Sequence, residues 1–343
     1  MTPPPASAAT PVPAPRATLP RLDPRRRLLR SVAIVACVPY IGLKAAWLAG
    51  SRAGIPQGSP LPEHRTTMAV ANALSVLLDA AVIVLAVVLT RPRARTAPAW
   101  AAVFPVWVGT GLLAPITAGY PLQLVVGALA GGGAGPADPG RRPFLDAWVF
   151  AVVYTGFIVQ GLALGALFAL YARDRWGRVW RGRMGDLPAG TTRAAQRACA
   201  GGAALAALLP LGTHLLWMLG GTAGLGPGRA AHRTSDFFVM EAVAIGFLLA
   251  AVTGGRLLGF RHGRRLPVAA ALALAWLGSG GTACWGGWLS LAPLGDGGDL
   301  GDPPTQLMNL TYAGQLVTGV LVAALGAHFC AERYAEALKR PPA

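Results

Sequence analysis

Apolar residues in this chain are gathered into eight long runs, separated by short stretches that are richer in charged residues, glycine or proline. The runs cover about residues 31–50, 67–90, 98–118, 147–171, 198–219, 236–255, 266–292 and 306–330. About 20 residues, rising 1.5 Å each, cross the hydrocarbon core of a bilayer. Lipid offers the backbone no hydrogen-bond partner, so a spanning segment forms a helix. The pattern predicts an all-α polytopic membrane protein with eight transmembrane helices.

Composition favours the same class. Hydrophobic residues make up 54% of the 343-residue chain and charged residues 13%, whereas a soluble domain carries about 25% charged residues. The four cysteines include no C-x-x-C pair, so neither a disulfide framework nor a zinc site is predicted.

The formal net charge is +16, which taken alone favours a nucleic-acid partner. The arginines, however, concentrate near both termini and in the stretches 91–95, 173–197 and 256–265. All of these fall on one side of the membrane if the N-terminus is cytoplasmic, as the positive-inside rule requires. We therefore expect a plasma-membrane protein with both termini in the cytoplasm. It would contact the lipid bilayer, including anionic lipid headgroups at the cytoplasmic face, and not nucleic acid.

One sequence pattern, K/H-x-x-W-x-x-G-x-x-x-G, occurs twice, 170 residues apart. Its copies are Lys44, Trp47, Gly50 and Gly54, and then His214, Trp217, Gly220 and Gly224. Three further blocks recur in the same order, namely His64-Arg65 with His232-Arg233, Trp107 with Trp276, and Tyr154 with Tyr312. The offset is 168–170 in the first three blocks and 158 in the last. An ordered series in which the spacing changes at one place predicts an internal duplication.

The duplication predicts two four-helix units in tandem. Four spans return the chain to the side on which it started, so the units have the same orientation and form a parallel repeat. The predicted divisions are a disordered Pro/Ala-rich cytoplasmic tail at 1–30, a first unit at 31–176, a basic cytoplasmic linker at 177–197, a second unit at 198–334 and a cytoplasmic tail at 335–343.

Ionisable residues inside apolar spans are costly and are therefore candidates for function. Lys44, His214 and Glu241 share one predicted level, roughly 8–9 Å below the outer ends of their helices. In one interpretation Lys44 reaches to the interface, His214 pairs with Glu241, and tryptophans form an interfacial belt. In the other, an outward-facing polar pocket binds an anion. Its predicted ligand-binding residues are Lys44, Trp47, His64, Arg65, His214, Trp217, His232, Arg233 and Glu241.

Asp79 lies deeper, roughly 18 Å into its helix. It is predicted to carry a proton, or to be neutral and hydrogen-bonded.

Enzyme chemistry has little support in the sequence. No phosphate-binding loop, zinc-protease or nucleophile-elbow motif is present, so no catalytic residue, metal or cofactor is predicted. Two four-helix units with histidines resemble the layout of haem A synthases, which would imply haem chemistry. However, His232 and His328 are predicted near opposite ends of their helices, too far apart to ligate one iron.

The segment from His214 to Gly224 resembles a small four-helix bacterial membrane domain of unknown function, and the whole chain resembles multi-pass membrane proteins of actinobacteria. The resemblance implies no catalytic residue, and Lys44 and Ser51 depart from the motif in the first half. The leading hypothesis is a non-enzymatic protein that binds or moves a small or lipid-like anion. The alternatives are a membrane enzyme of lipid or haem metabolism, and a structural or assembly partner.

Overall fold

The computed structural model describes residues 23–57, 59, 65–91, 98–129, 145–187, 191–291 and 303–339, and for residues 65–68 and 339 it describes the backbone only. Within that part of the chain, eight helical segments are long and apolar enough to cross a membrane. The prediction of an all-α, multi-pass membrane protein is therefore confirmed.

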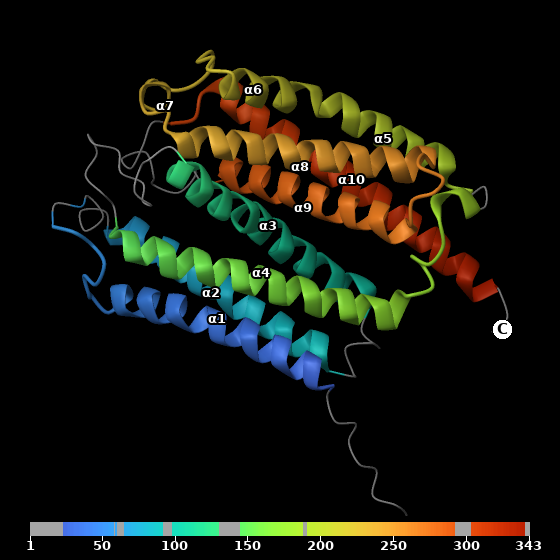
Figure 1. Ribbon diagram of the computed structural model, residues 1–343, viewed down its shortest axis with the longest axis horizontal. Helices are drawn as coiled ribbons and strands as arrows, with labels where there is room; N and C mark the ends of the chain where they lie inside the picture. Colours follow the sequence, from blue (N-terminus) through green and yellow to red (C-terminus); the bar gives the residue numbers. More distant parts are fainter. Residues whose placement is uncertain are drawn as a thin grey trace, which may run out of the picture.

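The spans are single helices except the fifth, in which two helices follow each other in line (Figure 1). They are α1 (Pro24–Leu48), α2 (Arg65–Thr90), α3 (Ala99–Leu129), α4 (Ala147–Trp176), α5 (Arg193–Ala206) with α6 (Leu208–Met218), α8 (Ser235–Phe260), α9 (Val268–Leu291) and α10 (Gln306–Lys339). A short helix, α7 (Pro227–Ala231), precedes α8. Pro210 follows the α5–α6 junction, and a proline interrupts helical hydrogen bonding because it has no N–H.

Helix ends differ from those predicted. α1 begins at Pro24, so residues 24–30 are helical rather than part of a disordered tail. Asp23 caps this helix by accepting a hydrogen bond from the Arg25 N–H at 3.2 Å, and proline is favoured at the first helical position. α3 continues to Leu129, and α10 extends to Lys339 through most of the predicted C-terminal tail. The apolar runs indicate only which residues cross the membrane core. A helix extends beyond such a run as long as its backbone hydrogen bonds continue.

The predicted basic linker is largely folded. Residues 177–187 lie against the loop between α8 and α9, where Met184 N–H donates to Leu266 O at 2.9 Å and Val268 N–H donates to Gly182 O at 3.1 Å. The Met184 side chain is 1% exposed and joins the core of the second half. α5 then begins at Arg193, within the predicted linker.

The bundle consists of two groups of helices that meet at α3. In the first half, α1 packs on α2 and α4, and α3 packs on α4. In the second half, α8, α9 and α10 pack on one another, and α5 and α6 cover α8 and α10. α3 joins the two groups by packing on α9 and α8, which leaves α1 and α6 on opposite sides of the molecule (Figure 1).

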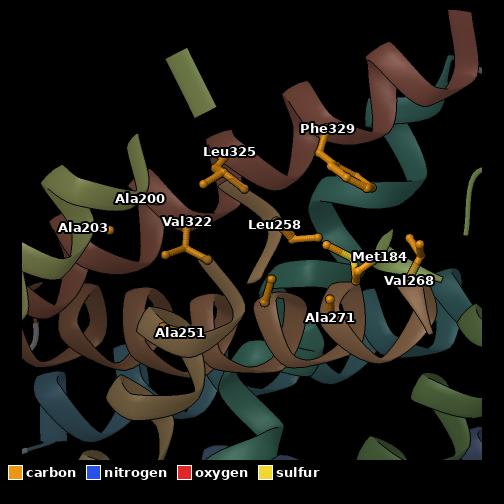
Figure 2. Close-up of a cluster of buried hydrophobic side chains, with 11 residues drawn as sticks. Met184, Ala200, Ala203, Ala251, Leu258, Val268, Ala271, Val322, Leu325 and Phe329 are labelled. Atoms are coloured by element: carbon orange, nitrogen blue, oxygen red, sulfur yellow. The ribbon is translucent and has the colours of Figure 1, made fainter. Parts of the chain in front are cut away.

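Small residues let the second-half helices approach closely. A Cβ added at Gly278 of α9 would overlap the backbone of Ala251 in α8, and one at Gly254 would lie 2.5 Å from the Ala275 nitrogen. Such contacts are typical of membrane helices, whose association depends on close packing. Figure 2 shows the apolar cluster beside this contact, with Leu258, Val322, Leu325 and Phe329 gathered above α9.

Candidate functional site

Two turns at one end of the bundle have the same geometry. We call this end, which carries residues 49–57 and 219–226, the hairpin end, and the opposite end, which carries residues 177–187, the linker end. Trp47 Nε1 donates to Ala53 O at 2.8 Å, and Trp217 Nε1 donates to Ala223 O at 3.0 Å. Each indole therefore satisfies a carbonyl of the turn that follows its helix.

The glycines of the repeated pattern explain the shape of these turns. Gly50 and Gly220 have φ of +91° and +94°, and Gly54 and Gly224 have φ of +71° and +78°. Glycine is favoured there because a side chain is strained at positive φ. A Cβ at Gly54 would overlap Val149 in α4, and a Cβ at Gly224 would overlap Leu307 in α10. The pattern encodes a turn packed against the last helix of each half.

A buried polar chain lies just below the second turn. His214 Nδ1 lies 2.5 Å from Glu241 Oε2, and His214 Nε2 lies 2.8 Å from Gln315 Nε2. The three residues come from α6, α8 and α10 and are 5%, 9% and 4% exposed. The contact between His214 and Glu241 that one interpretation expected is therefore present. Gln315 was missed because only ionisable residues were sought within the spans.

The donor and acceptor roles of His214, Glu241 and Gln315 follow from the atoms that face one another. An amide nitrogen only donates, so His214 Nε2 accepts from Gln315, and His214 Nδ1–H donates to the Glu241 carboxylate. In this arrangement the imidazole is neutral. Gln315 Oε1 is buried with no hydrogen-bond partner in the described part of the protein, and turning the amide over would present it to a protonated Nε2–H. The same three side chains therefore accommodate both protonation states of His214.

Arg229 and Tyr312 lie between the Glu241–His214–Gln315 group and the surface of the hairpin end. Arg229 Nη1, on the exposed helix α7, donates to the Tyr312 hydroxyl at 3.3 Å. Tyr312 is 4% exposed and lies one helical turn before Gln315 on α10. Polar groups thus extend from the surface of the hairpin end to the buried imidazole.

Two of the four residues predicted at the pocket mouth, Arg233 and His232, have contacts within the hairpin end. Arg233 donates to two carbonyls of the hairpin end, Gly220 O and Ala230 O, and so ties the turn to α7. His232 is exposed, and its Nδ1 lies 2.9 Å from Gly228 O. His64 and the side chain of Arg65 fall outside the described residues.

Lys44 belongs to a separate polar group in the first half. Its Nζ donates to Asn72 Oδ1 at 2.9 Å and lies 4.7 Å from the Trp47 ring centre and 4.9 Å from that of Tyr40. Cation–π contacts of this kind stabilise a partly buried ammonium. Because α1 and α6 lie on opposite sides of the molecule (Figure 1), the structure does not bring Lys44 to the His214–Glu241 pair.

Asp79 lies two helical turns deeper than Asn72 along α2. Gln160 Nε2, on α4, donates to Asp79 Oδ1 at 3.2 Å. The two residues are 3% and 0% exposed. Gln160 is a further polar residue whose contact the sequence analysis did not anticipate.

The described part of the chain contains no group of three or more His, Cys, Asp or Glu residues that could hold a metal ion. Its four cysteines are unpaired thiols.

Comparisons with protein-family models, with curated proteins and with solved structures gave no match. The chain is an integral membrane protein that crosses the bilayer several times.

Proposed function

We propose that this membrane protein is not an enzyme and that it binds or moves a small or lipid-like anion together with a proton. The site is the group formed by Arg229, Tyr312, His214, Glu241 and Gln315 at the hairpin end of the second half. The observation that carries the proposal is the buried Glu241–His214–Gln315 chain inside apolar helices. Ionisable groups inside a membrane span are rare and usually serve function.

The anion would be held first by Arg229. Its guanidinium has five N–H donors in a planar fork that suits carboxylate and phosphate groups. One of these donors bonds to the Tyr312 hydroxyl. This contact holds the Arg229 guanidinium near the buried Glu241–His214–Gln315 group.

The proton would be held by His214. An anion near the Glu241 carboxylate is repelled unless that charge is balanced, and an imidazolium at His214 balances it. Gln315 can accept a hydrogen bond from the charged form after its amide turns over.

Native mass spectrometry of the full chain in mild detergent tests the proposal. We expect the wild-type protein to retain the mass of an anionic molecule, and Arg229→Gln and His214→Gln to lose it. Lys44→Met is the matched control, because it removes an ionisable group from the other half, and it should keep the mass. A phospholipid mass would identify a headgroup, and a smaller mass a soluble anion. A bare wild-type mass, or a mass retained by both variants, would contradict the proposal.

We also propose that the two halves are tandem copies of one four-helix unit. Trp107 Nε1 donates to Ser279 Oγ at 3.0 Å, while Trp276 Nε1 donates to Thr110 Oγ1 at 3.1 Å. Trp107 and Trp276 are 169 residues apart, as are Thr110 and Ser279. Such reciprocal contacts are expected across a two-fold axis, which would run along the membrane normal between α3 and α9.

The orientation is proposed from charge. Arginines gather at the linker end, as in residues 173–183, which favours a cytoplasmic position beside anionic headgroups of the plasma membrane. Cysteines introduced at Ser51 and Arg181, both exposed, test this in intact cells. An impermeant thiol reagent should label only position 51, and labelling of position 181 alone would reverse the orientation.

A further inference from the structure

The pair formed by Asp79 and Gln160 is incomplete as a hydrogen-bonding unit. One amide N–H of Gln160 donates to Asp79 Oδ1. The remaining two oxygens, Asp79 Oδ2 and Gln160 Oε1, are buried and have no hydrogen-bond partner among the residues that the structure describes. Both are acceptors, so neither can satisfy the other when the carboxyl group is ionised.

Two unpaired acceptors in the interior of a membrane span are expensive. A buried polar group without a partner destabilises the fold, and an isolated charge does so more strongly. One proton removes both penalties. Protonated Oδ2 becomes a donor, and Gln160 Oε1 is the acceptor that lacks one, so acid and amide form two antiparallel hydrogen bonds.

We propose that Asp79 is a proton-binding site in the interior of the first half, with Gln160 as the side chain that receives the bound proton's hydrogen bond. A metal ion fits less well, because hard cations such as Ca²⁺ and Mg²⁺ take six or more oxygen ligands and this pair supplies two free oxygens. The site does not depend on the anion site proposed above, since it uses other residues in the other half.

The surroundings of Asp79 define what proton release requires. The ionisable groups that interact with Asp79 electrostatically are Lys44, Cys37 and Tyr40, all on α1, and α4 contributes the uncharged Gln160. Lys44 bonds to Asn72, seven residues and roughly 10 Å along α2 from Asp79. Cys37 donates to Ala33 O at 3.2 Å. Release of the proton therefore leaves a carboxylate for which Lys44 is the one cation among the described residues that interacts with it. Lys44 is bonded to Asn72 and must leave that residue to pair with the carboxylate.

Infrared difference spectroscopy of the full chain in detergent, recorded as the pH is changed, tests the site. We expect the wild-type protein to show the carbonyl band of a protonated, hydrogen-bonded carboxyl group. Asp79→Asn should lose that band and still fold, because the asparagine amide donates to Gln160 Oε1 in place of the acid. Glu241→Gln is the matched control in the second half and should keep the band.

A second variant covers the case in which Asp79→Asn does not fold. Gln160→Met keeps the acid and removes its partner, so the band should persist and shift to the higher frequency of a free carboxyl group. The proposal is overturned if Asp79→Asn has every carboxyl band of the wild-type protein. It is equally overturned if neither the wild-type protein nor Gln160→Met shows such a band at any pH at which the protein is folded. Anion retention in the mass-spectrometry experiment is unaffected by either result.

Discussion

The two halves of this protein place their polar residues at different depths on a similar frame. With the duplication proposed above, Lys44 corresponds to His214, and each is hydrogen-bonded to a polar residue of the next spanning helix, Asn72 in α2 and Glu241 in α8. Deeper in the membrane the halves diverge, because Gln160 corresponds to Thr318, and Phe247 and Leu248, which lie 168 and 169 residues after Asp79, are both apolar.

Near the hairpin end, the second half has the additional polar residue and the first half has an apolar one. Gln315, which completes the chain at His214, corresponds to Phe157, whose ring packs against Tyr40 at 4.9 Å. The first half therefore has an isolated acid in its interior, and the second has an extended polar chain close to its surface. In the proposed duplication, the two halves therefore bury different polar groups at different depths.

The largest expected effect concerns packing rather than chemistry. Gly278→Ala places a methyl group into the backbone of Ala251, whereas the corresponding Gly109→Ala meets the side chain of Leu164 at 3.4 Å. Overpacking against a backbone that cannot move should lower the free energy of unfolding by about 3 kcal/mol. Gly109→Ala should change it by less than about 1 kcal/mol, since alanine also favours the helix.

The free energy of unfolding of each variant can be measured by adding a denaturing detergent to the protein in mild detergent. Equal effects would show that the second half is not more tightly packed than the first.

A smaller effect is expected at the linker end, where Asp174 and Glu332 correspond. Asp174 pairs with Arg26, and its side chain is 26% exposed. Glu332 is 9% exposed and accepts hydrogen bonds from Thr191, Thr192 and Gln196. Glu332→Ala should therefore destabilise the protein by about 2 kcal/mol, because it removes the acceptor of several partly buried donors at once. Asp174→Ala should cost about 1 kcal/mol or less, as for other partly exposed ion pairs.

Thermal unfolding of the two variants compares them, with Glu332→Gln as the control that keeps an acceptor oxygen. A Glu332→Gln variant as unstable as Glu332→Ala would assign the effect to charge rather than to hydrogen bonds.

The sequence predicted the frame well because its signals are local. Apolar runs of sufficient length identified the spans, and the repeated tryptophan and glycine spacing marked two turns whose shape depends on positive φ. Helix ends were missed where charged turns, such as Arg173 to Arg175, continue a helix beyond the apolar run. Nothing in the local pattern stops a helix there, and only the packing around it decides where it ends.

The polar groups were predicted less well because they depend on distant partners. His214 and Glu241 stood out as ionisable residues in apolar helices. Asn72, Gln160 and Gln315 did not, since an uncharged amide is cheaper to bury and carries no sign of its partner. The sequence also placed Lys44 and His214 at one depth, which is a distance along the membrane normal. It gave no information on their separation within the membrane plane.

The smallest expected effect tests the similarity of the halves most directly. Gly50 and Gly220 have nearly the same φ, and a Cβ at either meets no atom within 4 Å. Alanine at each position is therefore penalised by backbone strain alone, about 1–2 kcal/mol for a left-handed residue. Gly50→Ala and Gly220→Ala should lower the free energy of unfolding by the same amount, measured in the same detergent. Gly42→Ala, in the open interior of α1, is the control and should be neutral or stabilising. Unequal losses at the two turns would mean that their shared geometry is held by different surroundings, and that the two hairpins are not equivalent parts of one repeated unit.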